Sequence, residues 1–131
     1  MHQNTVSLPP LSGHPTQDAW RFAAEKHYGQ RYPGTELPYL VHIGAVPLAL
    51  LPALDGATDA NLAVCCALLH DTVEDTETTR EELETRFGPA VAAGVAALSK
   101  NKNLPGEASM RDSLERIRKQ PREAWLVKLS D

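Results

Sequence analysis

The hydrophobic positions of this chain recur with the period of a helix. Residues 62–69 are all apolar, which indicates a helix that is buried on nearly every side. The segment from Ala19 to His27 places its apolar residues near one stripe, as an amphipathic helix does. Because neither an alternating strand pattern nor an internal repeat occurs, the sequence predicts an all-α protein.

Turn and capping signals divide the chain into about seven helices. Thr58 or Asp59 can cap the buried helix, and Thr79 with Glu82 fits a capping box for the helix that follows. Pro47 should kink or break the second helix, because proline removes a backbone donor. Residues 1–15 are rich in proline and predict an irregular arm, and residues 16–131 predict one domain. The predicted helices span about residues 16–27, 39–54, 59–69, 79–88, 90–98, 109–119 and 121–131.

Composition narrows the function classes. A formal charge of −4 and a pI near 5.7 argue against binding to a nucleic-acid backbone. The chain has two cysteines, Cys65 and Cys66, which are neighbours in the apolar helix and indicate small core residues in a reducing compartment. We expect a cytoplasmic protein with no membrane partner, because no apolar run approaches membrane-spanning length and the start lacks a signal pattern. The oligomeric state is left open by the sequence.

Four ionisable residues gather directly after the buried helix. The apolar run ends in His70-Asp71, and Glu74-Asp75 follows four positions later. On a continuous helix, His70 and Glu74 would lie one turn apart on one face. Buried carboxylates without a partner shift their pKa or bind a metal. The alternative from these residues alone is a helix end whose charges are solvated.

Two further polar residues come at or near the end of apolar stretches. His42 follows Tyr39-Leu40-Val41, and Asp131 follows residues 126–130 at the end of the last predicted helix. Together with His70 and Asp71 they form a mixed nitrogen and oxygen set, which suits Mn²⁺, Fe²⁺, Mg²⁺ or Zn²⁺. His27 competes with His42 as the second imidazole.

These residues lie within longer motifs. His-Asp-x-x-Glu-Asp-Thr at 70–76 stands in register with Pro-Tyr-x-x-His at 38–42 and Lys-Leu-x-Asp at 128–131. The combination resembles the HD-type metal-dependent phosphohydrolases. Within them it resembles the small alarmone hydrolases and the (p)ppGpp hydrolase domain of RelA/SpoT-type enzymes. The resemblance covers about residues 19–131 and implies a compact HD-domain helical bundle.

The resemblance also implies a cofactor and residue roles. It implies one divalent metal, usually Mn²⁺, and an acidic pair that handles the attacking water. The positions that match the family's metal ligands are His42, His70, Asp71 and Asp131. The positions that match the catalytic acidic pair are Glu74 and Asp75.

In the family, the scissile bond joins the 3′-diphosphate of (p)ppGpp to the ribose, and the products are GDP or GTP and pyrophosphate. Such a substrate brings several negative charges to an acidic protein, so cations are needed beside the metal. Three candidates lie on loops next to the metal-bearing helices: Arg31, Lys100 and Lys102. By residue type alone, each is as often a solvated loop cation.

The chain departs from the family pattern in the loop after residues 27–30, mildly at residues 99–101, where the family commonly has Thr-Lys, and at its end. After residues 27–30 the family has an Arg-Lys type pair, whereas this chain continues Arg31-Tyr32-Pro33-Gly34. Another nucleotide or phosphoester is therefore an alternative substrate. The family's last helix continues past its aspartate, whereas this sequence stops at Asp131, so we expect it to be part of a longer protein. A non-catalytic nucleotide-binding HD module is the second function class, although the Glu74-Asp75 pair favours an enzyme.

Overall fold

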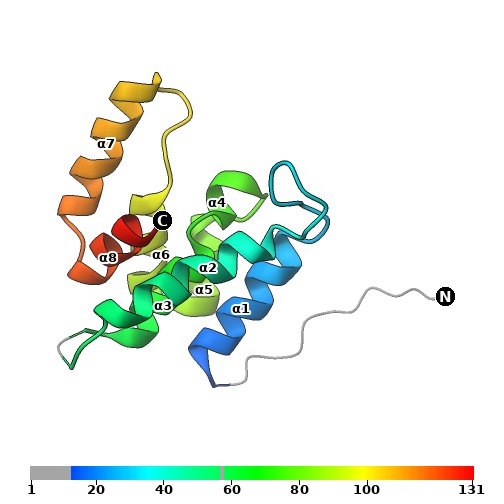
Figure 1. The fold of residues 1–131 in the computed structure, drawn as a ribbon. Helices are drawn as coiled ribbons and strands as arrows, with labels where there is room; N and C mark the ends of the chain where they lie inside the picture. Colours follow the sequence, from blue (N-terminus) through cyan, green and yellow to red (C-terminus); the bar gives the residue numbers. More distant parts are fainter. Residues whose placement is uncertain (1–12, 57) are drawn as a thin grey trace.

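The computed structural model describes residues 13–56 and 58–131, which form eight α-helices and one short 3₁₀ segment (Figure 1). The helices are α1 (Pro15–Lys26), α2 (Leu40–Leu50), α3 (Ala60–Leu69), α4 (Thr72–Asp75), α5 (Arg80–Phe87), α6 (Pro89–Leu98), α7 (Gly106–Arg118) and α8 (Arg122–Ser130), with η1 at Leu51–Ala53. Within the described residues, the only β-type pairing is one bridge between Arg31 and Pro38. The predicted all-α bundle is confirmed, with the short α4 as an additional helix.

Of the irregular arm predicted for residues 1–15, residues 1–12 lie outside the described part of the chain. Helix α1 begins at Pro15, which is inside the predicted arm, because proline suits the first turn of a helix. None of the described helices is both long and apolar enough to cross a membrane.

Helix α3 lies at the centre of the bundle and packs against α1, α2, α6 and α8 (Figure 1). It can contact four neighbours because its apolar residues cover almost the whole circumference. Its buried residues are Ala63, Cys65, Cys66, Ala67, Leu68 and Leu69. Burial raises the pKa of both cysteine thiols to about 12, so they stay protonated and pack as small core groups. The prediction of core cysteines is confirmed.

The capping predictions agree with the structure. Asp59 caps α3, and its side chain accepts a hydrogen bond from the backbone N–H of Leu62 at 3.0 Å. Thr79 caps α5 by accepting from the N–H of Glu82 at 3.1 Å. Gly88 separates α5 from α6 with a φ of 93°, a conformation that glycine adopts without strain.

The ends of two helices bear on these predictions. The second helix runs through Pro47 to Leu50 and then tightens into η1, so no break occurs at the proline. The buried helix ends before the charged cluster, in agreement with its predicted bounds, but the cluster does not lie on one continuous helix. It ends at Leu69, and α4 begins separately at Thr72, so His70 and Glu74 do not share one helical face.

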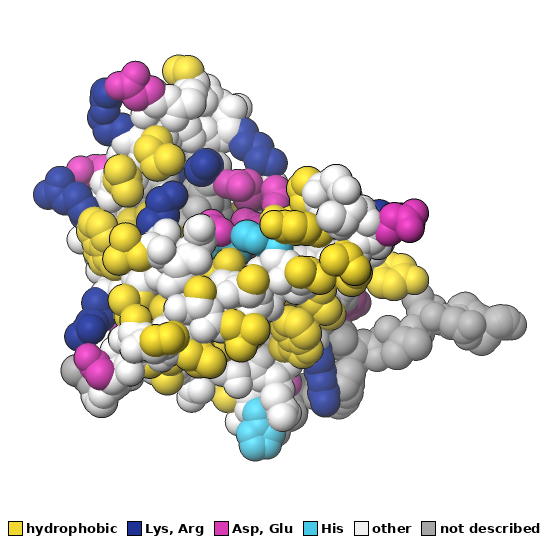
Figure 2. Space-filling view, in the orientation of Figure 1, with side chains coloured by type: hydrophobic (Ala, Val, Ile, Leu, Met, Phe, Trp, Pro, Cys, Tyr) yellow, Lys and Arg dark blue, Asp and Glu magenta, His cyan; other side chains and the backbone are white. Residues whose placement is uncertain are grey.

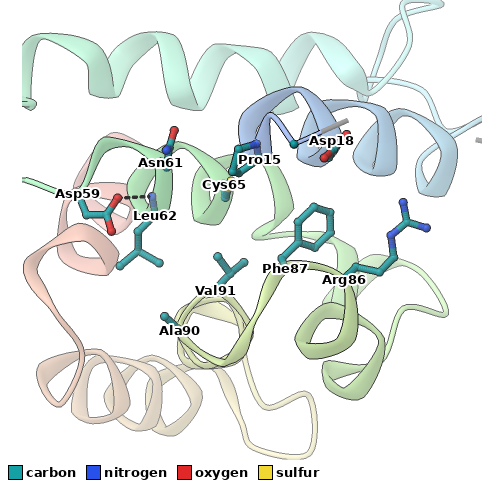
Figure 3. A pocket seen from close by; sticks show the side chains of 11 residues that line it. Pro15, Asp18, Asp59, Asn61, Leu62, Cys65, Arg86, Phe87, Ala90 and Val91 are labelled. Carbon is teal, nitrogen blue, oxygen red and sulfur yellow. Dashed lines mark hydrogen bonds between the residues drawn. The ribbon is translucent and has the colours of Figure 1, made fainter. Parts of the chain in front are cut away.

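A cavity of about 440 Å³ lies between the start of α1, helix α3 and the junction of α5 with α6 (Figure 3). Its lining combines apolar side chains such as Phe87 and Val91 with Asp18, Asp59 and Arg86. Asp59 already serves as the cap of α3. Because the lining includes none of the predicted metal ligands, this cavity is separate from the candidate chemistry.

A close contact between α6 and α3 generates a first prediction. A Cβ atom at Gly94 would lie 2.7 Å from the Sγ atom of Cys66. We expect Gly94→Ala to lower the free energy of unfolding by about 1–2 kcal/mol, because overpacking outweighs the gain of about 1 kcal/mol in helix propensity. Thermal and urea unfolding measure the change.

The matched control is Gly106→Ala, since a Cβ at Gly106 meets no atom within 4 Å. This control should leave stability unchanged or slightly raised. Cys66→Ala should cost less in the Gly94→Ala background than in the wild type, because it removes the clashing sulfur. Equal melting temperatures for Gly94→Ala and the wild type would contradict the tight contact.

Candidate metal centre

Three separate elements bring the predicted ligands together. His42 lies in the first turn of α2, His70 and Asp71 follow the end of α3, and Asp131 follows α8. The contact of α3 with both α2 and α8 places these helix ends at one point. Residues that are far apart in the sequence therefore form one cluster.

The donor atoms of this cluster lie close to one another. The Nε2 atom of His70 is 3.2 Å from Oδ2 of Asp71 and 3.6 Å from Oδ2 of Asp131. The Nε2 atom of His42 is 3.5 Å from Oδ2 of Asp71 and 3.4 Å from Oδ1 of Asp131. Each imidazole thus faces both carboxylates.

A hydrogen bond to the backbone of α3 fixes the orientation of the His70 ring. Its Nδ1 atom lies 2.6 Å from the carbonyl oxygen of Ala67, so Nδ1 carries the proton and donates it. Neutral His70 then presents the lone pair of Nε2 to the two carboxylates. This Nε2 is buried and has no hydrogen-bond partner among the described residues. A lone pair that faces two carboxylates requires a cation between them.

The pKa shifts report the same requirement. Burial alone lowers the pKa of His70, but the facing carboxylates of Asp131 and Asp71 outweigh burial and raise the pKa to about 10. Burial raises the pKa of Asp71, yet His70 and the hydroxyl of Tyr39 bring it down to about 2. Without a metal, a proton on His70 is therefore the cation that the cluster holds.

A divalent ion fits the same position. Four donors about 2.1 Å from one ion stand roughly 3.0–3.4 Å apart, and the observed separations of 3.2 to 3.6 Å are close to this spacing. Two imidazole nitrogens and two carboxylates form a donor set that suits borderline-to-hard divalent ions. The residues present therefore fit one divalent metal.

Tyr39 is a site residue that the sequence interpretation missed. Its hydroxyl donates a hydrogen bond of 2.7 Å to Oδ2 of Asp71. Burial, followed by this bond to Asp71, raises the pKa of Tyr39, so the hydroxyl stays protonated and keeps donating. The available signal was position, because Tyr39 precedes His42 by three residues at the start of α2. Such an outer partner orients a ligand toward the metal.

The acidic pair lies beside the candidate ligands. The Oε1 atom of Glu74 accepts a hydrogen bond of 2.7 Å from the backbone N–H of Lys100, so the loop after α6 holds this carboxylate. Asp71, Glu74 and Asp75 have carboxylate oxygens within 4.8 Å of one another. Burial, followed by the charges of Asp71 and Glu74, raises the pKa of Asp75.

The predicted cations have different surroundings. Lys100 lines a small cavity of about 90 Å³ at the metal centre, together with His70, Asp71 and Glu74. The Nζ atom of Lys102 donates to the backbone carbonyl of Glu74 at 2.5 Å. Arg31 instead pairs with exposed Glu36 at 3.7 Å and does not line this cavity.

His27, the competing imidazole, also lies outside the cluster. Its Nδ1 atom pairs with Oε1 of Gln30 at 2.8 Å, and its ring contacts the ring of Tyr39. The second histidine beside the two carboxylates, in addition to His70, is therefore His42. Figure 2 shows histidine and acidic side chains together in a hollow, with basic side chains nearby.

Comparisons with known proteins agree with this geometry. Residues 19–130 match the family described as HD domain. The guanosine-3′,5′-bis(diphosphate) 3′-pyrophosphohydrolase MESH1 of Danio rerio is 41% identical over 111 residues, which is 84% of this chain and 61% of the relative. A guanosine-3′,5′-bis(diphosphate) 3′-pyrophosphohydrolase of Aquifex aeolicus is 37% identical over 133 residues, which is 98% of this chain and 18% of the relative.

A solved structure shares the fold. It is described as "A metazoan ortholog of SpoT hydrolyzes ppGpp and plays a role in starvation responses". It matches with a TM-score of 0.75 at 30% identity and covers 95% of this chain and 68% of that chain. This chain spans about three fifths of the length of the MESH1 relatives from Danio rerio and Homo sapiens, 61% and 63%.

The hydrogen bond from Tyr39 to Asp71 generates the second prediction. We expect Tyr39→Phe to weaken Mn²⁺ binding about 10- to 100-fold, because outer partners of metal ligands commonly have effects of this size. Calorimetric titration of the metal-free protein measures the affinity. The matched control is Tyr28→Phe, since Tyr28 is 90% exposed. Equal Mn²⁺ affinity in both variants would contradict an orienting role for Tyr39.

Proposed function

The chain belongs to the HD-domain family, and from this membership we propose that it is a metal-dependent hydrolase of (p)ppGpp. The proposed reaction removes the 3′-diphosphate and gives GDP or GTP and pyrophosphate. The relatives described as guanosine-3′,5′-bis(diphosphate) 3′-pyrophosphohydrolases support this substrate. We propose Mn²⁺ as the metal and a reducing cytoplasm as the setting, which two free, buried cysteines suit.

One observation carries the proposal. The buried Nε2 atom of His70 faces the carboxylates of Asp71 and Asp131 in a cluster that needs a cation, and a second acidic pair stands directly beside them. The proposed metal ligands are His42, His70, Asp71 and Asp131. A site that only bound a structural metal would need the four ligands alone. The added carboxylates provide the proton acceptor that a hydrolysis requires.

Glu74 and Asp75 are the proposed groups that handle the attacking water. When bound, a divalent ion makes a water more acidic and polarises a phosphoryl oxygen. Glu74 is held toward the centre by the N–H of Lys100, and its carboxylate can orient the water and accept its proton. Asp75 has a raised pKa, so it can hold a proton at a higher pH than an ordinary aspartate.

The bond changes are those of a phosphoester hydrolysis. The water oxygen forms a bond to the phosphorus next to the ribose, and the bond from that phosphorus to the 3′-oxygen breaks. The proton released by the water goes to the acidic pair, and the ribose 3′-oxygen takes up a proton as it leaves. The transferred group departs as pyrophosphate.

A different nucleotide is the second candidate substrate. The ring of Tyr32 stacks on the ring of His42, with centroids 6.4 Å apart and planes 18° from parallel. Tyr32 is 40% exposed, so one face of an aromatic platform lies beside the metal centre. Such a platform favours a substrate with a nucleobase over a plain phosphoester, but stacking is tolerant of base identity.

The third prediction concerns turnover and metal dependence together. We expect the protein to release pyrophosphate from ppGpp with Mn²⁺, and His70→Ala to lose both Mn²⁺ binding and turnover. Glu74→Gln should keep its Mn²⁺ affinity and lose about 10²- to 10⁴-fold in kcat, since it removes only a proton acceptor. Pyrophosphate release is measured alongside calorimetric metal titration, with Mg²⁺ and Zn²⁺ in parallel.

The matched control is Glu84→Gln, on the exposed face of α5. It should leave both metal affinity and turnover unchanged. Turnover by a metal-free His70→Ala protein would exclude the proposed mechanism. Nucleotide binding without pyrophosphate release under any of the three metals would instead favour the non-catalytic HD module.

A further inference from the structure

We propose that Lys128 is a substrate-binding residue whose ammonium group contacts the diphosphate of the substrate and the pyrophosphate product. The inference rests on the proposed function and adds a basic residue to the three cations predicted on loops, which are Arg31, Lys100 and Lys102. Lys128 belongs to α8, the helix that also delivers Asp131 to the metal centre. The same helix therefore supplies a ligand for the metal and a cation for the substrate.

The position of Lys128 comes from the cavity at the metal centre. The cavity of about 90 Å³ is lined by the residues His70, Asp71, Glu74, Leu98, Lys100, Val127, Lys128 and Asp131. Two lysines from different elements thus border the same space as three of the proposed metal ligands. Lys100 comes from the loop after α6, and Lys128 comes from the last turn of α8.

The ammonium groups of these two lysines are available. Among the described residues, neither side chain has a hydrogen bond or an ion pair, although three carboxylates border the same cavity. Most arginines of the described chain are paired, as Arg116 is with Asp112 at 3.1 Å and Arg122 is with Asp55 at 3.6 Å. The half-buried Lys128 borders the cavity and has no carboxylate partner among the described residues.

The charges of the metal, the carboxylates and the substrate support a role for Lys128 in binding the diphosphate. A divalent ion offsets only two of the three negative charges of Asp71, Glu74 and Asp131. A diphosphate that enters this cavity adds further negative charge and needs nearby donors. Lys100 and Lys128 border the cavity from two elements, so they can contact phosphate oxygens that the metal does not neutralise.

A purely structural role makes a different prediction. Lys128 lies in the last turn of α8, where a cation stabilises the helix dipole. Such a role would appear as lost stability and leave anion binding unchanged. Lys119 is the matched comparison, because it is an exposed lysine at the C-terminal cap of α7 and does not line the metal-centre cavity.

The experiment uses pyrophosphate as the probe. We expect Lys128→Met to weaken pyrophosphate binding to the Mn²⁺-loaded protein about 10- to 100-fold, the size of one lost charge-assisted contact. Lys128→Arg should stay within a few-fold of the wild type, and Lys119→Met should be unchanged. Mn²⁺ affinity and melting temperature should be equal in all four proteins. The kcat/KM for ppGpp should fall in parallel with pyrophosphate affinity.

The outcomes separate this inference from the proposed function. If the wild type binds pyrophosphate but releases none from ppGpp, the proposed function fails while the Lys128 contact is still measured directly. Unchanged pyrophosphate affinity in Lys128→Met would overturn the inference. A lower Mn²⁺ affinity or a lower melting temperature in Lys128→Met would also overturn the inference, because Lys128 would then act through the placement of Asp131.

Discussion

The bundle depends on a repulsion that it has to compensate. Two carboxylates converge on the buried Nε2 atom of His70 at 3.2 and 3.6 Å, and this arrangement needs a cation. In the metal-free chain, a proton on His70 satisfies this need, and its raised pKa reflects that. A divalent ion satisfies it with more charge. The end of α3 and the packing of α8 on α3 hold these donor atoms in place.

The end of helix α3 at Leu69 determines where the imidazole of His70 lies. If the helix continued, the backbone would carry His70 and Asp71 onward along its own axis. Because it ends at Leu69, its last turn leaves the carbonyl of Ala67 free to accept from Nδ1 of His70, and Thr72 accommodates the turn by donating to the carbonyl of Leu69 at 2.7 Å. The interruption thus fixes the tautomer of His70. The apolar stretch before it anchors the interruption in the core.

Local sequence signals were sufficient for most of the fold and for part of the site. The caps at Asp59 and Thr79 were readable because one side chain satisfies a nearby backbone donor in each case. The geometry after Leu69 was not, because residues 62–75 have no glycine or proline to indicate that a separate helix begins at Thr72. The motifs named the four candidate ligands, whereas Tyr39 and Lys128 acquire their surroundings from packing between helices that are distant in the sequence. Their roles, like those of the ligands, are proposals that the variants test.

The motif identifies Asp131 as a candidate ligand, but the packing of α8 on α3 brings it to the metal centre. The first turn of α8 is tied to the start of α3, since buried Glu123 accepts a 2.7 Å hydrogen bond from the N–H of Asp59. The far ends of the two helices meet again at His70 and Asp131. At about 1.5 Å per residue, the paths from Asp59 to His70 and from Glu123 to Asp131 are about 16 and 12 Å, and side-chain reach spans the difference. Two helices tied at one end and of similar length therefore bring a ligand to the metal centre, and the register of α8 on α3 decides whether the cluster closes.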